Sequence, residues 1–309
     1  MSTGIQWTDE TWNPVVGCNQ VSPECDNCYA KTLHDKRHKA VLAGKKLAPQ
    51  YAQPFEVVQF KPERLREPLS WKKPRRVFVN SVSDLFHKDV PAAFLDQVFA
   101  VMALAPRHTF QILTKRAGRM RSYMAELSQN PAERLSAAAF EEFGEDGDCT
   151  VANVINGYSW WRNMPPRDAP LNGSHPLWPL PNVWLGVSVG NNAAASRIGA
   201  LRQTPAAIRF VSFEPLLEFV NADLSGVQWA IMGGESGKGA RPFDLAWARH
   251  LVNRCRVFDT APFVKQLGAN PVAYGIPVAL RDSHGGDMAE WPEDLRVREF
   301  PSHLAQAVR

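Results

Sequence analysis

The chain has 309 residues, a formal net charge of +4 and 45% hydrophobic residues. This length suits one large α/β domain or two smaller ones, and the apolar content argues against global disorder. The mild positive charge falls short of the strong basicity that dedicated nucleic-acid modules carry. No apolar run approaches the roughly 20 residues of a membrane helix, and the polar start MSTGIQWTDE lacks a signal pattern, so we expect a cytoplasmic protein with no membrane partner.

Short runs rich in Val, Ile and Phe recur along the chain, and polar or glycine-bearing stretches follow them. Near-continuous apolar runs of this length are typical of strands that are buried on both faces. We therefore expect strands at Trp12–Cys18, Arg76–Asn80, Thr109–Leu113, Val183–Val189, Ile208–Phe213, Val227–Met232 and Pro262–Lys265.

Helix-like segments lie between most of these runs. Pro91–Leu104 starts with a proline at a suitable first helical position and has apolar residues three and four apart. Asp244–Arg256 has the same spacing, and Asp244 can cap it. Alternating strands and helices predict a parallel sheet with right-handed crossovers. The expected fold is α/β: a partial or full (β/α) barrel formed as a single domain by residues 1–309.

One interval, residues 117–181, interrupts the alternation. Arg119–Leu127 and Pro131–Phe143 have helical patterns, and the stretch that follows is rich in Gly, Pro, Asn and Trp. We expect an inserted helical and loop cover, in which Trp160, Trp161 and Trp178 pack rather than stack on bases.

Three of the five cysteines, Cys18, Cys25 and Cys28, lie within eleven residues with the spacing Cys-x6-Cys-x2-Cys. In a reducing compartment such a group indicates metal or redox chemistry rather than a disulfide framework. Three thiolates can hold three irons of a [4Fe–4S] cluster and leave the fourth iron open. Two alternatives remain, namely a zinc site that is completed by one of His34, His38 and His87, and cysteines that merely fill the core.

Polar residues that follow the predicted strands are further candidate site residues, because the active sites of such barrels lie at the carboxyl ends of strands. These residues can instead have structural roles. The small polar residues can form turns or cap helices, and the charged residues can form an ion pair. Catalytic residues stay unassigned. The residues that we expect to bind a cofactor are Ser81, Ser83, Asp84, Glu214, Gly233, Gly234, Glu235 and Lys265.

Positive charge gathers in three clusters, Lys31–Lys46, Trp71–Arg76 and Lys115–Arg121. They are either solvated helix and loop faces or a surface that contacts a polyanion.

Several segments together resemble a radical SAM-like family of phage and bacterial proteins of unknown function. The resemblance covers nearly the whole chain. It is carried by TWNPVVGCNQVSPECDNCYA, VFVNSVSDLFH, FQILTKR, LPNVWLGVSV, RFVSFEPLL, IMGGESGKGARP, PFVKQLG and WPEDLRVREFP.

This resemblance implies a radical SAM-type barrel in which Cys18, Cys25 and Cys28 bind the cluster. It implies that S-adenosyl-L-methionine (SAM) chelates the open iron and is cleaved to methionine and a 5′-deoxyadenosyl radical, which takes hydrogen from the substrate. An electron donor such as flavodoxin or ferredoxin would supply the electron. The substrate is unknown, and a nucleic acid or nucleotide is the class that the basic clusters favour.

The chain departs from the common radical SAM pattern in three ways and from the family that it resembles in one. The usual spacing is Cys-x3-Cys-x2-Cys, and Asn27 stands where an aromatic residue usually precedes the third cysteine. The Gly233–Glu235 triplet follows the sixth predicted strand instead of the second, and Gly190 stands where this family commonly has a glutamate. The alternative functions are a zinc-binding, nucleic-acid-associated protein without radical chemistry, and a degenerate scaffold that binds a partner protein.

Overall fold

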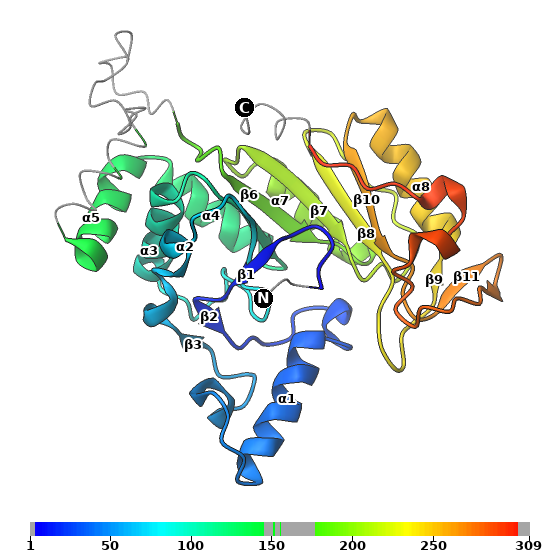
Figure 1. The fold of residues 1–309 in the computed structure, drawn as a ribbon. Helices are drawn as coiled ribbons and strands as arrows, with labels where there is room; N and C mark the ends of the chain where they lie inside the picture. Colours follow the sequence, from blue (N-terminus) through cyan, green and yellow to red (C-terminus); the bar gives the residue numbers. More distant parts are fainter. Residues whose placement is uncertain (1–3, 145–150, 152–154, 156–176, 302–309) are drawn as a thin grey trace. The chain divides into compact units, whose positions relative to one another are not determined.

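The computed structural model describes residues 4–144, 151, 155 and 177–301 (Figure 1). The chain divides into two compact units, each built from separate stretches of sequence. Unit 1 comprises Met1–Asn19, Ala30–Leu185 and Thr204–Ala207, and unit 2 comprises Gln20–Tyr29, Gly186–Gln203 and Ile208–Arg309.

Seven strands form the main sheet, in the order β1-β4-β5-β6-β7-β8-β10. The pairings β1–β4, β4–β5, β7–β8 and β8–β10 are all parallel. Six of the seven predicted runs match these strands to within two residues at each end, and β6 and β8 are buried throughout, as expected for a parallel sheet. The strands are β1 (Glu10–Trp12), β4 (Arg76–Val79), β5 (Thr109–Thr114), β6 (Val183–Ser188), β7 (Ile208–Phe213), β8 (Trp229–Gly233) and β10 (Ala261–Gln266).

The first predicted strand, Trp12–Cys18, is wrong as a single element. β1 ends at Trp12, and β2 (Val15–Val16) pairs antiparallel with β3 (Gln59–Phe60) in a separate two-stranded sheet. The reason is Pro14, which has no N–H with which to continue the ladder of β1. Its carbonyl instead accepts a hydrogen bond from the Lys61 N–H at 2.7 Å. Cys18 therefore follows β2 and not a strand of the main sheet.

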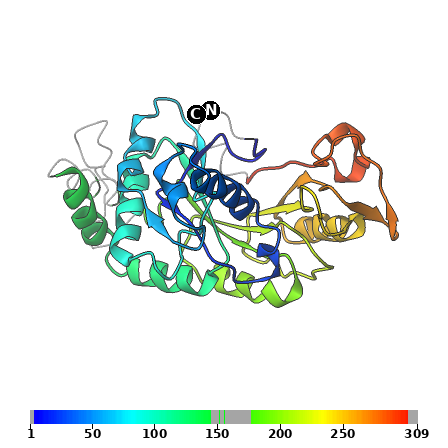
Figure 2. The same ribbon diagram turned by 90° about the horizontal axis from the view of Figure 1, so that it is seen from below.

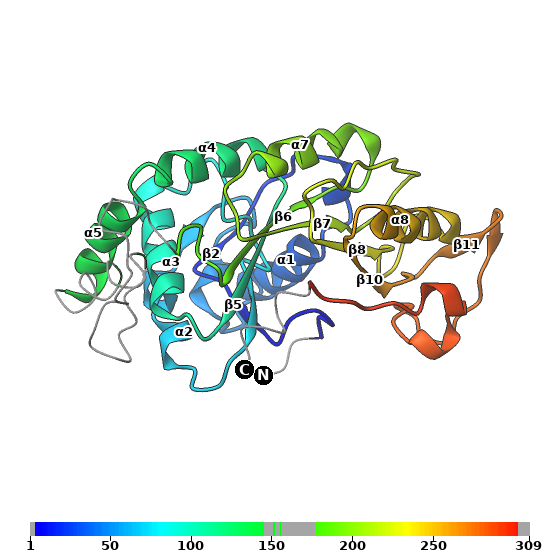
Figure 3. The same ribbon diagram turned by 90° about the horizontal axis from the view of Figure 1, so that it is seen from above.

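In unit 1, Figure 3 shows α3 and α4 beside the strands, and α5 packs on α3. Pro91 is the N-cap of α3, and the two helices that were predicted within the insertion are confirmed as α4 and α5. The rest of the predicted cover, with Trp160 and Trp161, lies outside the described residues. The helices are α1 (Tyr29–Leu42, of which Tyr29 belongs to unit 2), α2 (Glu67–Ser70), α3 (Ala92–Leu104), α4 (Ala117–Leu127) and α5 (Pro131–Phe143), with the 3-10 turns η2 (Pro49–Ala52) and η3 (Pro62–Arg64).

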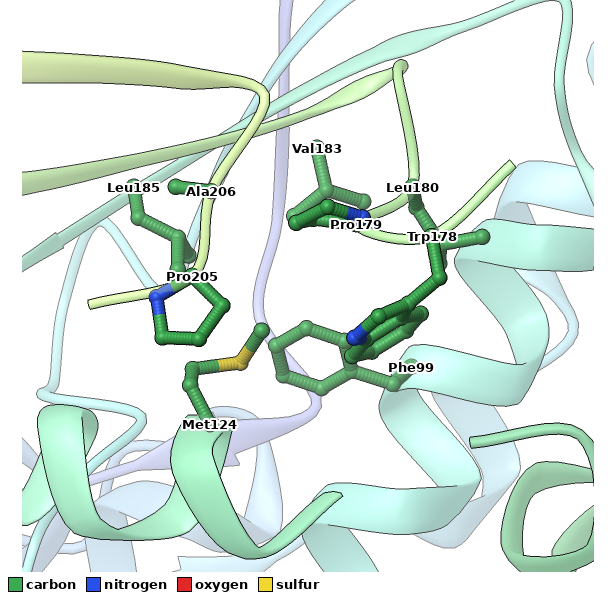
Figure 4. Close-up of a pocket in the computed structure, with 9 residues that line it drawn as sticks. All are labelled: Phe99, Met124, Trp178, Pro179, Leu180, Val183, Leu185, Pro205 and Ala206. Atoms are coloured by element: carbon green, nitrogen blue, oxygen red, sulfur yellow. The ribbon is translucent and has the colours of Figure 1, made fainter. Parts of the chain in front are cut away.

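A small apolar cavity marks where the described end of the insertion packs in unit 1 (Figure 4). Trp178 lies beside Phe99 and Met124 there, and its indole N–H donates to Ser128 Oγ at 2.8 Å. The cavity volume is about 10 Å³, roughly the room of one water-sized sphere. Trp178 is thus a packing residue, as expected, and the cavity is too small for a substrate.

In unit 2, α8 packs on β8 and β10 beside a small second sheet (Figure 3). The predicted cap of α8 is confirmed, because Asp244 Oδ1 accepts a hydrogen bond from the Ala246 N–H at 2.8 Å. The helices and turns are η1 (Pro23–Cys25), η4 (Asn192–Ala194), α7 (Ser196–Arg202), α8 (Leu245–Val257), η5 (Met288–Glu290) and η6 (Glu293–Leu295), and the second sheet contains β9 (Phe243–Asp244), β11 (Pro271–Ala273) and β12 (Ile276–Pro277).

The fold is therefore mixed α/β with a seven-stranded parallel sheet. The strand order ends at β1 and β10, which is consistent with a partial β/α barrel. No helix in the described part of the chain is both long enough and apolar enough to cross a membrane.

Candidate functional site

Cys18 is fixed by the backbone that surrounds it in unit 1. Gly17 has a φ of +87°, and a Cβ there would lie 2.3 Å from the Val57 carbonyl oxygen, so the turn into Cys18 requires glycine. The Cys18 N–H donates to the Phe55 carbonyl at 2.9 Å, and Gly17 forms a parallel bridge with Ser83, just after β4. These contacts hold the first cysteine at the carboxyl end of β4.

Arg116 places a positive charge beside the Cys18 sulfur. One guanidinium nitrogen lies 3.6 Å from Cys18 Sγ and 2.9 Å from Asp84 Oδ2, and the other donates to Asn19 Oδ1 at 2.7 Å. Asp84 is buried and also accepts the Thr114 hydroxyl at 2.6 Å. A fixed cation beside a sulfur favours the thiolate, which is the form that binds metals.

The turn that carries the other two cysteines lies in unit 2. The Cys28 N–H donates to the Cys25 carbonyl at 3.2 Å, which closes a tight turn. Glu24, just before it, is buried, and its Oε1 accepts the Gly190 N–H at 3.1 Å and the Arg197 guanidinium at 3.0 Å. Gly190 follows β6, so the turn is tied to the carboxyl end of that strand.

The contacts of Glu24 also give a physical account of Gly190. A Cβ at Gly190 would lie 2.3 Å from the Pro215 carbonyl oxygen and 2.4 Å from Glu24 Cγ. The space that a side chain at position 190 would need is thus filled by the Glu24 side chain. Burial raises the pKa of Glu24, but hydrogen bonds, including that from the Gly190 N–H, and the Arg197 charge outweigh it and leave the pKa below 4.5.

The two residues between Cys25 and Cys28 are held from the loop after β8. Asn27 Nδ2 donates to Glu235 Oε2 at 2.9 Å, and Arg241 lies 3.3 Å from Asp26 Oδ2. Arg241 also pairs with both carboxylate oxygens of Glu235. Burial raises the pKa of Glu235, but these bonds from Arg241 and Asn27 outweigh it and lower the pKa below its usual value.

Most of the other predicted cofactor-binding residues make contacts within the protein. Ser81 Oγ donates to Asn13 Oδ1 at 3.2 Å and Ser83 Oγ to the Val15 carbonyl at 2.7 Å. A Cβ at Gly234 would lie 2.6 Å from the Leu267 carbonyl oxygen, so this glycine allows close backbone packing. Roles in cofactor binding for these residues stay predictions.

Glu214 and Lys265 are a half-buried ion pair in unit 2. Lys265 Nζ lies 2.5 Å from Glu214 Oε1, and the two side chains are 17% and 18% exposed. Glu214 follows β7, and its carboxyl carbon lies 3.6 Å from where a Cβ on Gly233 would be. An ion pair was the structural alternative for these charged residues, and the structure shows it between Glu214 and Lys265. The partial exposure of both side chains still allows them to contact a ligand.

The thiols are chemically suited to a cluster, since Cys18, Cys25 and Cys28 are partly exposed and form no disulfide with any described residue. Cys18 lies in unit 1, whereas Cys25 and Cys28 lie in unit 2. Within the described ranges, no three His, Cys, Asp or Glu side chains are gathered as a group that could hold a metal ion. The cluster therefore stays a prediction that the donor chemistry fits.

The histidines of the zinc alternative are engaged elsewhere or buried. His34 Nε2 and His38 Nδ1 lie 2.8 Å from the carbonyl oxygens of Gln53 and Tyr51, respectively. His87 is fully buried, and its Nδ1 accepts the Asp89 N–H at 3.2 Å. Burial, followed by the Arg116 charge, lowers the pKa of His87.

Three residues that anchor the cysteine turn were not found from the sequence, namely Glu24, Arg197 and Arg241. Arg197 is 173 residues away from Glu24, and Arg241 is 215 residues away from Asp26. The only local signal was the position of Arg241, six residues after Glu235 in GGESGKGARP.

Comparison with known proteins gives one match. Neither a curated protein nor a solved structure matches the chain. The model of a family described as "Protein of unknown function (DUF5131)" matches residues 2–290, which is nearly the whole chain. The chain therefore belongs to this family, DUF5131.

Proposed function

We propose that this protein is a radical SAM-type iron–sulfur enzyme, with a [4Fe–4S] cluster on Cys18, Cys25 and Cys28. The observation that carries the proposal is the anchoring of the three thiols. All three thiols are partly exposed, and each part of the motif is tied to the carboxyl end of a parallel strand. A surface cysteine with no function needs no such set of buried carboxylates and arginines around it.

When bound, the cluster supplies an electron that cleaves SAM to methionine and a 5′-deoxyadenosyl radical. An electron donor of the flavodoxin or ferredoxin class provides that electron. The residues of this chain bind the cluster and orient its ligands. Arg116 holds its positive charge beside Cys18, and Glu235 holds the Cys25–Cys28 turn through Asn27 and Arg241.

Glu214 and Lys265 are the residues that we assign to cosubstrate binding. Their side chains are only partly exposed, and a carboxylate and an ammonium group can respectively accept from and donate to the amino acid end of SAM. We also assign Ser81 and Ser83, in unit 1, and Gly233, in unit 2, to cofactor binding. Glu235 acts on the turn rather than on the ligand, because both of its oxygens are already bonded.

The substrate class that we propose is a nucleobase or nucleotide. The support is electrostatic, because the chain has an excess of positive charge and three basic clusters. No observation on the described residues favours the zinc alternative over the cluster, since two of its three candidate histidines are bonded to backbone carbonyls.

Metal analysis of anaerobically purified protein tests the cluster. We expect a brown protein with about four irons per chain, and Cys18→Ala, Cys25→Ala and Cys28→Ala should each lose that iron. Cys255→Ser is the matched control, because Cys255 is buried and burial raises the pKa of its thiol to about 12, which makes it unreactive. A colourless protein with one zinc, or full iron content in any of the three alanine variants, would overturn the assignment.

A further inference from the structure

The helix that follows the cysteine turn belongs to an arm with unusual charge. The arm (residues 30–61) contains most of α1 with η2 and β3, and Figure 1 shows α1 standing out from the rest of unit 1. Figure 2 views the same helix from below. The arm contains seven Lys and Arg against two Asp and Glu, a net charge of +5, whereas the whole chain has +4. The remaining residues therefore sum to −1, and the arm carries the entire positive excess of the protein.

Much of α1 faces solvent. Its only buried residues are Ala30 and His34, and His34 packs edge-on against Tyr51 and Phe55 of the same arm. A helix that is polar around most of its circumference gains little from burial, so a folded helix of this kind is suited to contacting a partner.

Four lysines of the arm are exposed and form no ion pair with any residue that the structure describes: Lys36, Lys39, Lys45 and Lys46. Lys36 and Lys39 lie one turn apart on the same side of α1, and the other two continue just beyond its end. Lys31, by contrast, is neutralised by Asp35 and Glu56, at 3.1 and 2.6 Å.

The other two basic clusters have some of their cations in ion pairs within the protein. In the second cluster, Arg75 pairs with Glu10 and Arg76 with Asp9, and only Lys72 and Lys73 form no ion pair with a described residue. In the third, Arg116 pairs with Asp84. The arm therefore presents the largest set of uncompensated positive charge among the three clusters.

The arm's aromatic side chains do not provide a stacking platform. Arg37 lies over the Tyr51 ring at 5.0 Å, Phe55 is buried, and Phe60 contacts Phe94 at 5.3 Å between ring centroids. Binding of single strands relies on such platforms. An exposed basic helix without them fits a duplex backbone, and a helix of 10–12 Å diameter matches the major groove of B-form DNA, which is about 12 Å wide.

We propose that this arm docks double-stranded DNA through phosphate contacts from Lys36, Lys39, Lys45 and Lys46. The contact is independent of sequence, because lysine–phosphate pairs position a duplex without reading its bases. A-form RNA fits less well, since its major groove is too narrow for a helix. The inference extends the proposed function by naming the polymer that would present the substrate, but it does not depend on the cluster.

Fluorescence anisotropy of the full chain with a labelled DNA duplex of about 20 base pairs tests the proposal, at 50 to 200 mM salt. Each phosphate contact releases roughly 0.9 counterion. Four contacts therefore predict a slope of about −3.6 when the logarithm of the association constant is plotted against the logarithm of the salt concentration. The variant Lys36→Gln/Lys39→Gln/Lys45→Gln/Lys46→Gln should bind at least tenfold more weakly at 50 mM salt, with a slope close to zero.

A matched control removes four positive charges from exposed lysines outside the arm. This control is the variant Lys72→Gln/Lys73→Gln/Lys88→Gln/Lys238→Gln. It should keep most of the affinity and slope, and both variants should unfold at the wild-type temperature because only exposed groups change. Equal loss in the control would overturn the proposal, as would equal or tighter binding to single strands, duplex RNA or anionic vesicles. The full chain carrying Cys18→Ala should bind DNA like wild type, so loss of the cluster and loss of docking are separable.

Discussion

At the scale of single residues, two glutamates that look alike in the sequence have different surroundings. Glu235 is buried, and both of its oxygens are bonded to Arg241, with Asn27 as a further donor. Glu214 has Lys265 as its ion-pair partner and is 18% exposed. We therefore expect the first to support the cysteine turn and the second to meet the cosubstrate.

The variant Glu235→Gln should weaken the turn without touching a cysteine. Hydrogen bonds to charged groups contribute about 1.5–3 kcal/mol each, so we expect a free energy of unfolding lower by about 2 kcal/mol. Iron should leave the variant several-fold faster than wild type in the presence of a chelator. Unchanged iron release together with lost SAM affinity would instead show that Glu235 contacts the ligand.

The variant Glu214→Gln should show the opposite pattern. It should keep its iron and bind SAM tenfold to a hundredfold more weakly, because one charge-assisted hydrogen bond of about 1.5–3 kcal/mol is lost. Isothermal titration of the cluster-loaded protein measures this affinity. If the variant binds SAM like wild type, the Glu214–Lys265 pair is structural.

At the scale of elements, the cysteine turn depends on ion pairs to elements far away in the sequence. Glu24 connects η1 to α7 through Arg197, and Arg241 connects the loop after β8 to Asp26. The Glu24 side chain is fully buried, so removing its charge would leave Arg197 without its carboxylate.

The lowered pKa of Glu24 makes this link sensitive to acid. A carboxyl group whose pKa is lower in the folded state stabilises the fold at pH values above its unfolded pKa, near 4.5. That stabilisation is lost as the pH falls through the lower folded value. Urea unfolding between pH 7 and pH 3 should therefore show less loss of stability for Glu24→Gln than for wild type.

The matched control for this pH dependence is Glu293→Gln, a glutamate that is exposed in η6. It should follow the wild-type curve at every pH. At pH 7, Glu24→Gln should be less stable than wild type by about 2 kcal/mol, because a charged hydrogen-bonding partner is lost. Parallel curves for Glu24→Gln and wild type would contradict the assigned pKa shift.

At the scale of the whole molecule, the sheet could be predicted because each strand is a short apolar run that can be recognised from its own residues. The exception, Trp12–Cys18, shows the limit, because one proline moved Cys18 off the main sheet. The cysteine motif could also be recognised from a short stretch of sequence. The residues that hold it could not be predicted, because Glu24 and Arg197 are 173 positions apart and neither spacing nor composition indicates their contact.

The proposed radical SAM chemistry at the three cysteines can be tested by analysing the products of SAM. Protein with a verified cluster is reduced anaerobically and incubated with SAM, and the products are analysed by mass spectrometry. We expect 5′-deoxyadenosine and methionine in equal amounts from wild type, and neither product from the Cys18→Ala variant. Intact SAM after incubation with reduced, cluster-loaded wild-type protein would contradict it.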